Sequence, residues 1–383
     1  MKPGALDHAA RISRVRSLLE RIGRLPKTGG TPADACMFAC QDGIGWEDIY
    51  YLCGFMGSSS VFVVTKDDAV LFVDPRYSDA AKACGSCRSV SCADVSRLSP
   101  LQAALDFIAA KKPRKVAYGG KRFSHVTYRY VEKCLGSDVE LLDVSSVLLN
   151  YRRQKSEAEV GFIRKAAEIA ARALVETVAE VRAGVTEREF AALLEFRMKS
   201  YGADFVDPAP VMVASGVRTS QPHAHPTDRR MQRGDLVLVD FGARVSGYVC
   251  DITRMLSVGE PSEEIKSLYT ILKWAQTEAA SLIGPGCRTS AVDAASRGVL
   301  SGANLGDYFV HGAGHGIGLS MHEQPSLSAA SGAALAAGDV LAVEPGFYRP
   351  GWGGMRLEDD FLVTADGCER LTTGLSNELF VIQ

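Results

Sequence analysis

Hydrophobic positions in the first part of the chain alternate between helical spacing and short apolar runs. Apolar side chains recur at helical spacing over residues 5–24, where the pattern stops at Gly23. Helices are also predicted at residues 101–110 and 127–135. Four apolar runs predict strands, at residues 35–39, 60–65, 69–74 and 115–118. This alternation is typical of an α/β domain, which we expect to span residues 1–150.

The second domain, expected over residues 151–383, begins with a charged connector and two helical patterns. Ser156 with Glu159, and Thr186 with Glu189, have the form of capping boxes, so helices should run from there to about residues 182 and 201. Further helices are expected at residues 263–283 and 290–302. Two helices followed by a hairpin, twice over, hint at an internal duplication, although the sequence shows no self-similarity.

Residues 234–254 are predicted to form two strands joined by a tight turn, and they carry Asp240 and Asp251 within apolar runs. If the turn centres on Val245 and Ser246, the two carboxylates face each other across the hairpin. Two bare carboxylates there would repel each other and pay a desolvation cost, so a cation is expected between them. Carboxylate oxygens suit a divalent metal. The alternative is an exposed hairpin whose aspartates face water.

Histidines and further acidic residues gather in the C-terminal part of the chain. Five of the seven histidines fall between residues 223 and 322, and glycines flank His315, which lets the backbone approach a ligand closely. Glu344 ends one apolar run and Glu358 precedes another. Singly, such histidines are usually structural and such acids are usually surface strand ends. With Asp240 and Asp251 they give four carboxylates and one imidazole, enough to hold two divalent ions.

This set of ligands has a chemical use. Two divalent ions lower the pKa of a shared water towards neutrality. A neighbouring carboxylate then takes its proton, and histidines stabilise the charge that develops on the substrate. Hydrolysis of an amide is the natural application. The sequence lacks the His-Glu-x-x-His motif of zinc metalloproteases, the Gly-x-Ser-x-Gly motif of α/β-hydrolases and the Gly-x-x-x-x-Gly-Lys motif of P-loop proteins.

Composition narrows the class of protein. With 383 residues, 46% hydrophobic and 23% charged, the chain is typical of a soluble protein of about two domains. The net charge of -2 gives no reason to expect nucleic-acid or membrane partners. No signal peptide or membrane span is apparent, so we expect a cytoplasmic protein whose ten cysteines are reduced. Cys84-Gly-Ser-Cys87, with Cys92 nearby, resembles zinc or redox sites but lacks a second Cys/His pair.

The motifs together resemble the pita-bread-fold metallopeptidases, in their Xaa-Pro peptidase branch of prolidases and aminopeptidases P. The resemblance covers almost the whole chain. Its motifs, in order, are Arg152-Arg-Gln-Lys-Ser-Glu-Ala-Glu159, Val239-Asp-Phe-Gly242, Asp251-Ile-Thr-Arg254, His311-Gly-Ala-Gly-His-Gly-Ile-Gly318, Met321-His-Glu-Gln-Pro325, Val343-Glu-Pro-Gly-Phe-Tyr348 and Gly353-Gly-Met-Arg-Leu-Glu-Asp359.

The resemblance implies a role for each candidate residue. Asp240 would bind one metal, Asp251 and Glu358 would bridge both, and His315 with Glu344 would complete the other. Glu344 would also be the general base. His322 would contact the scissile carbonyl region and His223 would assist the leaving group. His311 and Arg356 would shape the proline subsite and tie down the site.

The resemblance also implies an N-terminal creatinase-like α/β domain, an α+β pita-bread catalytic domain and a homodimer. Two divalent ions are expected, Mn²⁺ first, with Co²⁺ or Zn²⁺ as alternatives. Tyr51-Leu-Cys-Gly-Phe-Met-Gly-Ser58 and Val73-Asp-Pro-Arg-Tyr77 resemble Xaa-Pro aminopeptidases more than prolidases, so aminopeptidase activity on proline-containing peptides is favoured. The alternatives are a dipeptidase that acts on Xaa-Pro dipeptides, a non-catalytic binding protein, and a metal enzyme of the same fold with a non-peptide substrate.

Overall fold

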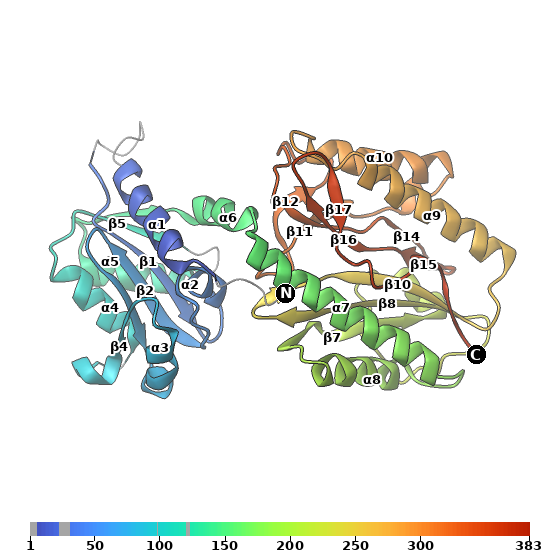
Figure 1. The fold of residues 1–383 in the computed structure, drawn as a ribbon, viewed down its shortest axis with the longest axis horizontal. Coiled ribbons are helices and arrows are strands. Elements are labelled where there is room, and N and C mark those ends of the chain that lie inside the picture. Colours follow the sequence, from blue (N-terminus) through green and yellow to red (C-terminus); the bar gives the residue numbers. More distant parts are fainter. Residues whose placement is uncertain (1–5, 23–30, 98, 120–122) are drawn as a thin grey trace. The chain divides into compact units, whose positions relative to one another are not determined.

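The computed structural model describes residues 6–22, 31–97, 99–119 and 123–383. They form two compact units, one within residues 5–152 and one comprising residues 153–383 (Figure 1). None of the helices in these described ranges is both long and apolar enough to cross a membrane.

The N-terminal unit is built on a six-stranded mixed sheet of order β4-β3-β2-β1-β5-β6. Neighbours β1, β2 and β3 are antiparallel, whereas β1, β5 and β6 run parallel, as do β3 and β4. The strands are β1 (Ala35–Gln41), β2 (Ser59–Thr65), β3 (Ala69–Val73), β4 (Arg88–Ser91), β5 (Lys115–Gly119) and β6 (Glu140–Asp143). The four strands predicted from apolar runs are therefore confirmed, and the two edge strands β4 and β6, which are short and half-exposed, were not foreseen.

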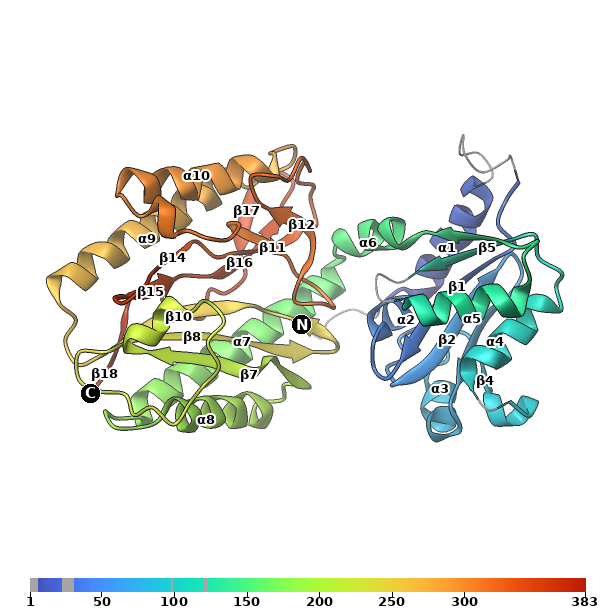
Figure 2. The same ribbon diagram turned by 180° about the vertical axis from the view of Figure 1, so that it is seen from behind.

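Helices cover both faces of this sheet (Figures 1 and 2). On one face lie α1 (His8–Ile22) and α2 (Trp46–Cys53); on the other lie α4 (Pro100–Ala109) and α5 (His125–Leu135). The apolar stripe of α1 is buried, as its helical spacing predicted. The predicted end of that helix at Gly23 lies outside the described residues. Two short helices complete the unit, α3 (Ser78–Cys84) and α6 (Ser145–Arg153).

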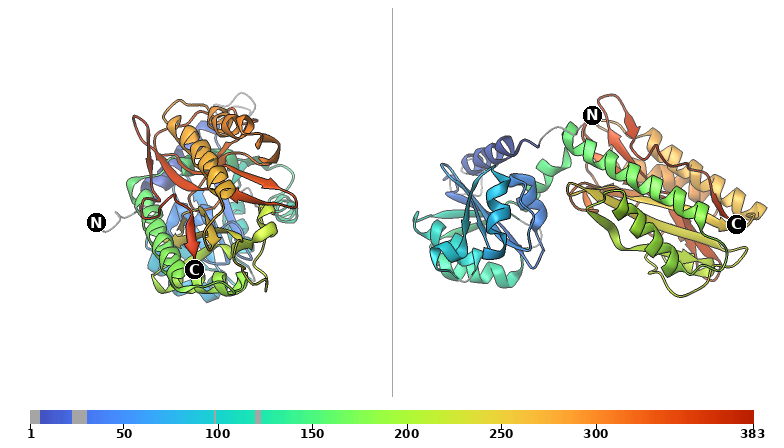
Figure 3. Two further views of the ribbon diagram at one scale, coloured as in Figure 1. Left: turned by 90° about the vertical axis from the view of Figure 1, so that its right-hand side faces the viewer. Right: turned by 60° about the horizontal axis from the view of Figure 1, so that its bottom comes forward.

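The C-terminal unit contains two helix pairs, each packed on a sheet. The first pair, α7 (Glu157–Glu180) and α8 (Glu187–Ser200), lies side by side (Figure 3) and shares a core with the β18-β10-β8-β7 sheet. Both predicted capping boxes are formed: the backbone N–H groups of Ser156 and Thr186 donate to Glu159 and Glu189, each at 2.8 Å. The strands are β7 (Phe205–Ser215), β8 (Leu236–Val245), β9 (Tyr248–Val249), β10 (Ile252–Val258) and β18 (Phe380–Ile382).

The second pair, α9 (Glu263–Ser281) and α10 (Thr289–Gly302), packs on the remaining strands. Five of these form a sheet of order β12-β11-β13-β16-β17, and β14 pairs with β15. The strands are β11 (Gly314–Gly316), β12 (Glu323–Leu327), β13 (Val340–Val343), β14 (Gly346–Arg349), β15 (Gly353–Arg356), β16 (Asp359–Val363) and β17 (Cys368–Arg370). Helices were predicted at both α9 and α10.

The register of the aspartate hairpin differs from the prediction by two residues. Asp240 pairs with Thr253, not with Asp251, because the turn centres on Ser246 and Gly247. Both turn residues have positive φ, 48° and 81°, as a type I′ turn requires. The predicted turn would have forced β-branched Val245 into that strained conformation. A shift of two residues preserves the alternation of faces, so both aspartates still point to the same side of the sheet.

Candidate metal centre

The five predicted metal ligands come from adjacent strands of the two sheets in the C-terminal unit. Asp240 lies within β8 and Asp251 immediately precedes β10. His315 is the central residue of β11, Glu344 follows β13 and Glu358 precedes β16. Since β11, β13 and β16 are neighbours, the last three lie together.

Hydrogen bonds between Thr253 and Glu358 help to join these strands to the hairpin. The Glu358 N–H donates to the Thr253 carbonyl at 3.2 Å, and the Thr253 hydroxyl donates to Glu358 Oε2 at 2.7 Å. The two sheets therefore meet at the point where their acidic residues lie.

Four of the five candidates lie close together. Ligand atoms of Asp251, His315 and Glu358 lie within 4.8 Å of one another, and all three residues are buried. His315 Nε2 is 3.7 Å from Asp251 Oδ2 and 3.5 Å from Glu344 Oε1. Glu344 is partly exposed, whereas Asp240 is buried and one of its oxygens, Oδ1, has no hydrogen-bond partner within the described structure. A buried carboxylate oxygen without a hydrogen-bond partner fits a ligand to a cation.

The electrostatics of the site also fit a divalent ion. Burial raises the pKa of Asp251 well above its usual range, and the charges of Glu358 and Asp240 raise it further. Burial likewise raises the pKa of Glu358, Glu344 and Asp240. Four carboxylates in this position are costly unless a cation compensates them, and oxygen donors with one imidazole suit a hard or borderline divalent metal.

His315 is held in the form that a metal ligand needs. Its Nδ1 lies 3.1 Å from the Gly316 carbonyl, which assigns the proton to Nδ1 and leaves the lone pair on Nε2 facing the carboxylates. Burial lowers the pKa of His315 to about 4, so the ring stays neutral at physiological pH.

The glycines beside His315 allow close packing of the neighbouring strands. A Cβ at Gly314 would lie 2.0 Å from the Ala342 carbonyl oxygen, and one at Gly316 would lie 2.3 Å from that of Gln324. Glycine at both positions lets β11 fit between its neighbours β12 and β13. The tight packing fixes the position of the His315 backbone.

Arg356 supports the carboxylates from within the protein. It is buried, and its guanidinium donates to Asp240 Oδ2 at 2.5 Å, to the Thr253 hydroxyl at 2.9 Å and to the Tyr348 hydroxyl at 2.9 Å. A further bond at 3.1 Å reaches the Pro222 carbonyl. These contacts orient Asp240 and, through Thr253, Glu358. Thr253 and Tyr348 had no predicted role; both lie inside motifs of the resemblance, which was the available signal.

A cavity of about 780 Å³ opens above the cluster. The cavity is lined by His223 and His322, which were predicted to flank a substrate, and by His311, which was predicted to shape the proline subsite. The rings of His322 and His315 are 4.2 Å apart. His311 is tied to the protein, with Nδ1 2.8 Å from the Gly312 carbonyl and Nε2 2.9 Å from the Tyr348 hydroxyl, and burial lowers its pKa. His315, Glu344 and Arg356 complete the part of the wall nearest the carboxylates.

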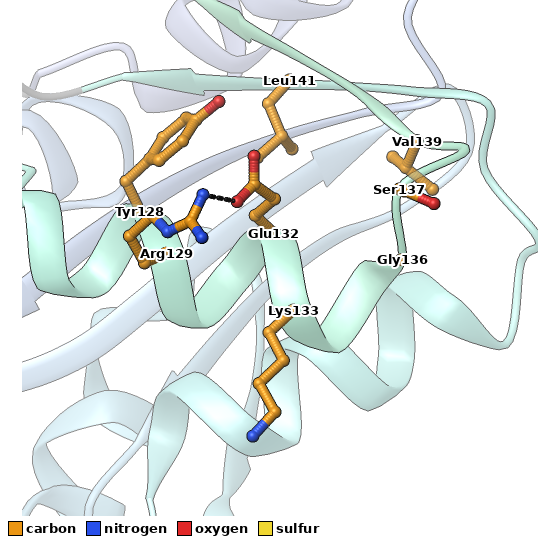
Figure 4. Close-up of a pocket in the computed structure, with 8 residues that line it drawn as sticks. All are labelled: Tyr128, Arg129, Glu132, Lys133, Gly136, Ser137, Val139 and Leu141. Atoms are coloured by element: carbon orange, nitrogen blue, oxygen red, sulfur yellow. Dashed lines mark hydrogen bonds and ion pairs between the residues drawn. The ribbon is translucent and has the colours of Figure 1, made fainter.

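Another hollow, of about 560 Å³, lies on the N-terminal unit between α5 and β6. Figure 4 shows the Arg129–Glu132 ion pair and Lys133 among the residues that line this hollow. The lining includes Gly136, Val139 and Leu141. It lacks the converging acids and imidazoles of the larger cavity, so we place the functional site in the C-terminal unit.

Proton binding gives a prediction for the metal-free protein. Burial raises the folded-state pKa of Asp251, Glu358 and Asp360, so the folded state holds these protons more tightly than the unfolded state. The stabilisation that comes from binding these protons is complete below the unfolded-state pKa values of about 4. It is lost as the pH rises through the raised pKa values of the folded state. We expect the thermal midpoint of chelated protein to fall by at least about 5 °C between about pH 5 and about pH 8.

The matched control is the metal-loaded protein. A bound cation keeps the carboxylates ionised and compensated, so its midpoint should vary much less over the same range. Differential scanning calorimetry of the two forms makes the comparison. A parallel pH dependence of both forms would show that the cluster does not bind the metal.

Comparison with known proteins gives a consistent assignment. Metallopeptidase family M24 matches residues 161–365, and the creatinase/prolidase N-terminal domain matches residues 29–154. An uncharacterized peptidase of Bacillus subtilis is 35% identical over 337 residues, covering 88% of this chain and 93% of that protein.

Two solved structures are similar over nearly their whole length. The X-Pro aminopeptidase of Thermotoga maritima is 33% identical with a TM-score of 0.84, covering 91% of this chain and 98% of that one. The Xaa-Pro dipeptidase of Bacillus anthracis is 30% identical with a TM-score of 0.88, covering 98% and 100%. With the ligand cluster and the two matched domains, these similarities show that the chain belongs to metallopeptidase family M24.

Proposed function

We propose that the protein is a dinuclear metal-dependent Xaa-Pro aminopeptidase, which hydrolyses the bond between an N-terminal residue and a following proline. The observation that carries the proposal is the convergence of Asp251, His315, Glu344 and Glu358 at one end of a cavity lined by histidines. Similar solved structures are described as an X-Pro aminopeptidase and an Xaa-Pro dipeptidase. A cavity of about 780 Å³ is large enough for a short peptide.

The proposed ligands are Asp240, Asp251, His315, Glu344 and Glu358. Divalent ions held there would supply an activated water and polarise the scissile carbonyl. We favour Mn²⁺, with Co²⁺ or Zn²⁺ as alternatives, because oxygen-rich ligation with one imidazole accommodates all three. A homodimer and a cytoplasmic location remain predictions from the sequence.

The protein's own groups complete the proposed chemistry. Glu344 accepts the proton of the attacking water, a role that suits a carboxylate whose pKa is raised by burial. His322, which lies against His315, donates to the carbonyl oxygen as charge develops, and His223 assists departure of the proline nitrogen. Arg356 keeps Asp240 in place throughout.

The aminopeptidase preference is based on two motifs in the N-terminal unit. In the structure they contact each other: the Tyr77 hydroxyl lies 2.8 Å from Ser58 Oγ, and the rings of Tyr77 and Phe55 meet edge to face. These contacts explain the motifs as local packing. The choice between aminopeptidase and dipeptidase therefore needs an assay.

The decisive measurement is hydrolysis of an Xaa-Pro dipeptide beside a longer Xaa-Pro-Xaa peptide, with Mn²⁺ added and then removed by a chelator. We expect metal-dependent cleavage of the longer peptide. The matched control is the same peptide with alanine in place of proline. Cleavage of the dipeptide alone would identify a dipeptidase instead. Bound metal without cleavage of either would indicate a non-peptide substrate, and absence of stoichiometric metal would indicate a binding protein.

A further inference from the structure

Part of the cavity wall is formed by residues 309–313, which lie between α10 and β11 in the chain. Phe309 and Ala313, at the two ends of this segment, are buried. Val310 and His311, between them, line the cavity above the carboxylate cluster. The Val310 side chain is 66% exposed, although it is apolar. The segment therefore offers an apolar side chain and an imidazole to a molecule that enters the cavity.

One guanidinium holds the backbone on both sides of Val310. Arg297 Nη1 donates to the Phe309 carbonyl and Nη2 donates to the His311 carbonyl, each at 2.8 Å. The same guanidinium lies over the Phe309 ring, 4.3 Å from the ring centre. Two carbonyl groups that are two positions apart are thereby held by one planar group, which fixes the backbone between them.

Asp293 orients that guanidinium from the preceding turn of α10. Its carboxylate is almost completely buried and accepts from Arg297 Nε and Nη2, both at 3.1 Å. This forked contact leaves the guanidinium little freedom to rotate. Asp293 also accepts from the Ala313 N–H at 2.9 Å. The two residues of α10 therefore bind the segment at three backbone groups.

The segment is also confined on the side of β12. A Cβ at Gly312 would lie 2.6 Å from the Leu327 carbonyl oxygen. Further along the cavity wall, His311 Nε2 lies 2.9 Å from the Tyr348 hydroxyl, which accepts a hydrogen bond from Arg356. A shift of the segment would therefore move His311 relative to Tyr348 and to the site that Arg356 supports.

We propose that Arg297, oriented by Asp293, is a positioning residue for substrate binding, which holds Val310 and His311 where they contact the peptide. Arg297 is not among the residues that line the cavity, so it acts through the segment. The inference rests on the proposed peptidase function and extends it to a residue outside the cavity. Because His311 is proposed to shape the proline subsite, loss of Arg297 should weaken substrate binding more than it slows the chemical step.

The alternative is that Arg297 only stabilises the C-terminal unit through its ion pair with Asp293. Lysine could replace arginine in that role, because it keeps the positive charge. The two carbonyl bonds need the planar fork of a guanidinium, which an ammonium group on a flexible stem does not provide. Arg297→Lys therefore distinguishes the two explanations.

The kinetic test uses metal-loaded Arg297→Lys and Arg297→Met with an Xaa-Pro-Xaa peptide. We expect KM to rise at least about fivefold in both variants, with kcat within about threefold of the wild-type value and metal content unchanged. A wild-type KM in Arg297→Lys would overturn the proposal in favour of the ion-pair explanation. An unchanged KM in both variants, or a loss confined to kcat, would also overturn it.

Arg172→Met is the matched control. Arg172 likewise donates to an acid four residues along its helix, Glu176, at 2.9 Å, and lies over an aromatic ring, that of Tyr201, at 4.0 Å. It belongs to α7 and does not line the cavity. Its replacement should leave KM within about twofold of wild type, as expected for an exposed ion pair. An equal rise of KM in this control would remove the special role of Arg297.

Hydrogen–deuterium exchange of the metal-loaded protein tests the same inference without a substrate. The amides of residues 309–313 should exchange at least about tenfold faster in Arg297→Met than in wild type, and should be unaffected in Arg172→Met. Unchanged exchange in Arg297→Met would show that the segment does not depend on Arg297 and would overturn the proposal. A wild-type protein that cleaves no peptide would instead overturn the proposed function, and the exchange rates would still decide whether Arg297 holds the segment.

Discussion

Replacing Asp251 with alanine is expected to abolish peptide hydrolysis and to remove bound metal while the fold persists. Asp251 Oδ2 lies 3.7 Å from His315 Nε2, and its ligand atom lies within 4.8 Å of those of both His315 and Glu358. A carboxylate in this central position contacts whatever cation the cluster holds. Metal ions contribute several kcal/mol to catalysis, and each ~1.4 kcal/mol is a factor of ten, so kcat/KM should fall by about 10³-fold or more.

The fold should survive because the Asp251 carboxylate lowers the stability of the protein when no metal is bound. Burial and neighbouring acids raise the pKa of Asp251 well above its usual range, so its ionised form destabilises the metal-free protein. At neutral pH, chelated Asp251→Ala should therefore unfold at a temperature equal to or above that of chelated wild type. Metal content, kcat/KM and the thermal midpoint are measured on the same sample. Stoichiometric metal with near-normal turnover would remove Asp251 from the ligand set.

His322→Ala provides the matched control for that experiment. His322 lines the same cavity, with its ring 4.2 Å from that of His315, but it is proposed to act on the substrate. This variant should retain the metal and lose about 10²–10⁴-fold in rate, as is typical of a lost acid-base partner. Loss of metal in His322→Ala would place that histidine among the ligands.

Local patterns in the sequence were sufficient to predict most elements and several residues of the candidate site, among them Asp251, His315 and Glu358, which the structure brings together. Apolar runs predicted the interior strands because those strands are buried on both faces, whereas the half-exposed edge strands β4 and β6 carry a weaker signal. Acidic residues at or near strand ends predicted a metal site because four carboxylates together with one imidazole are enough to hold divalent ions. The prediction that Asp240 lies opposite Asp251 was wrong. The turn forms at residues that tolerate positive φ, which are Ser246 and Gly247 and not the predicted Val245 and Ser246.

Contacts between distant segments could not be predicted in this way. The junction of the two sheets includes the bond from Glu358 N–H to the Thr253 carbonyl, and nothing within either segment specifies the other. Buried charges are the clearest case, because an arginine within an apolar strand indicates a buried partner without saying where in the chain that partner lies.

Arg254 is such a residue, and it lies directly behind the metal centre. Its side chain is fully buried within β10. The guanidinium donates to the Glu358 carbonyl at 2.6 Å, to Asp359 Oδ1 at 2.6 Å and to the Ser376 carbonyl at 2.9 Å. It thereby joins β10 to the segment that carries the proposed ligand Glu358 and to the C-terminal segment of the chain. The Arg254–Asp359 ion pair is completely excluded from solvent.

Replacing Arg254 with alanine should lower the free energy of unfolding of the C-terminal unit by about 3–5 kcal/mol, because it leaves the Asp359 carboxylate buried with reduced compensation. Arg370 and Thr372 still donate to Asp359 Oδ1, but its Oδ2 already lacks a partner within the described structure. Urea unfolding measures the loss. The matched control is Arg164→Ala, which breaks an exposed pair with Glu369 and should cost less than about 1 kcal/mol. Equal effects of the two substitutions would mean that the buried pair contributes no more than a surface one.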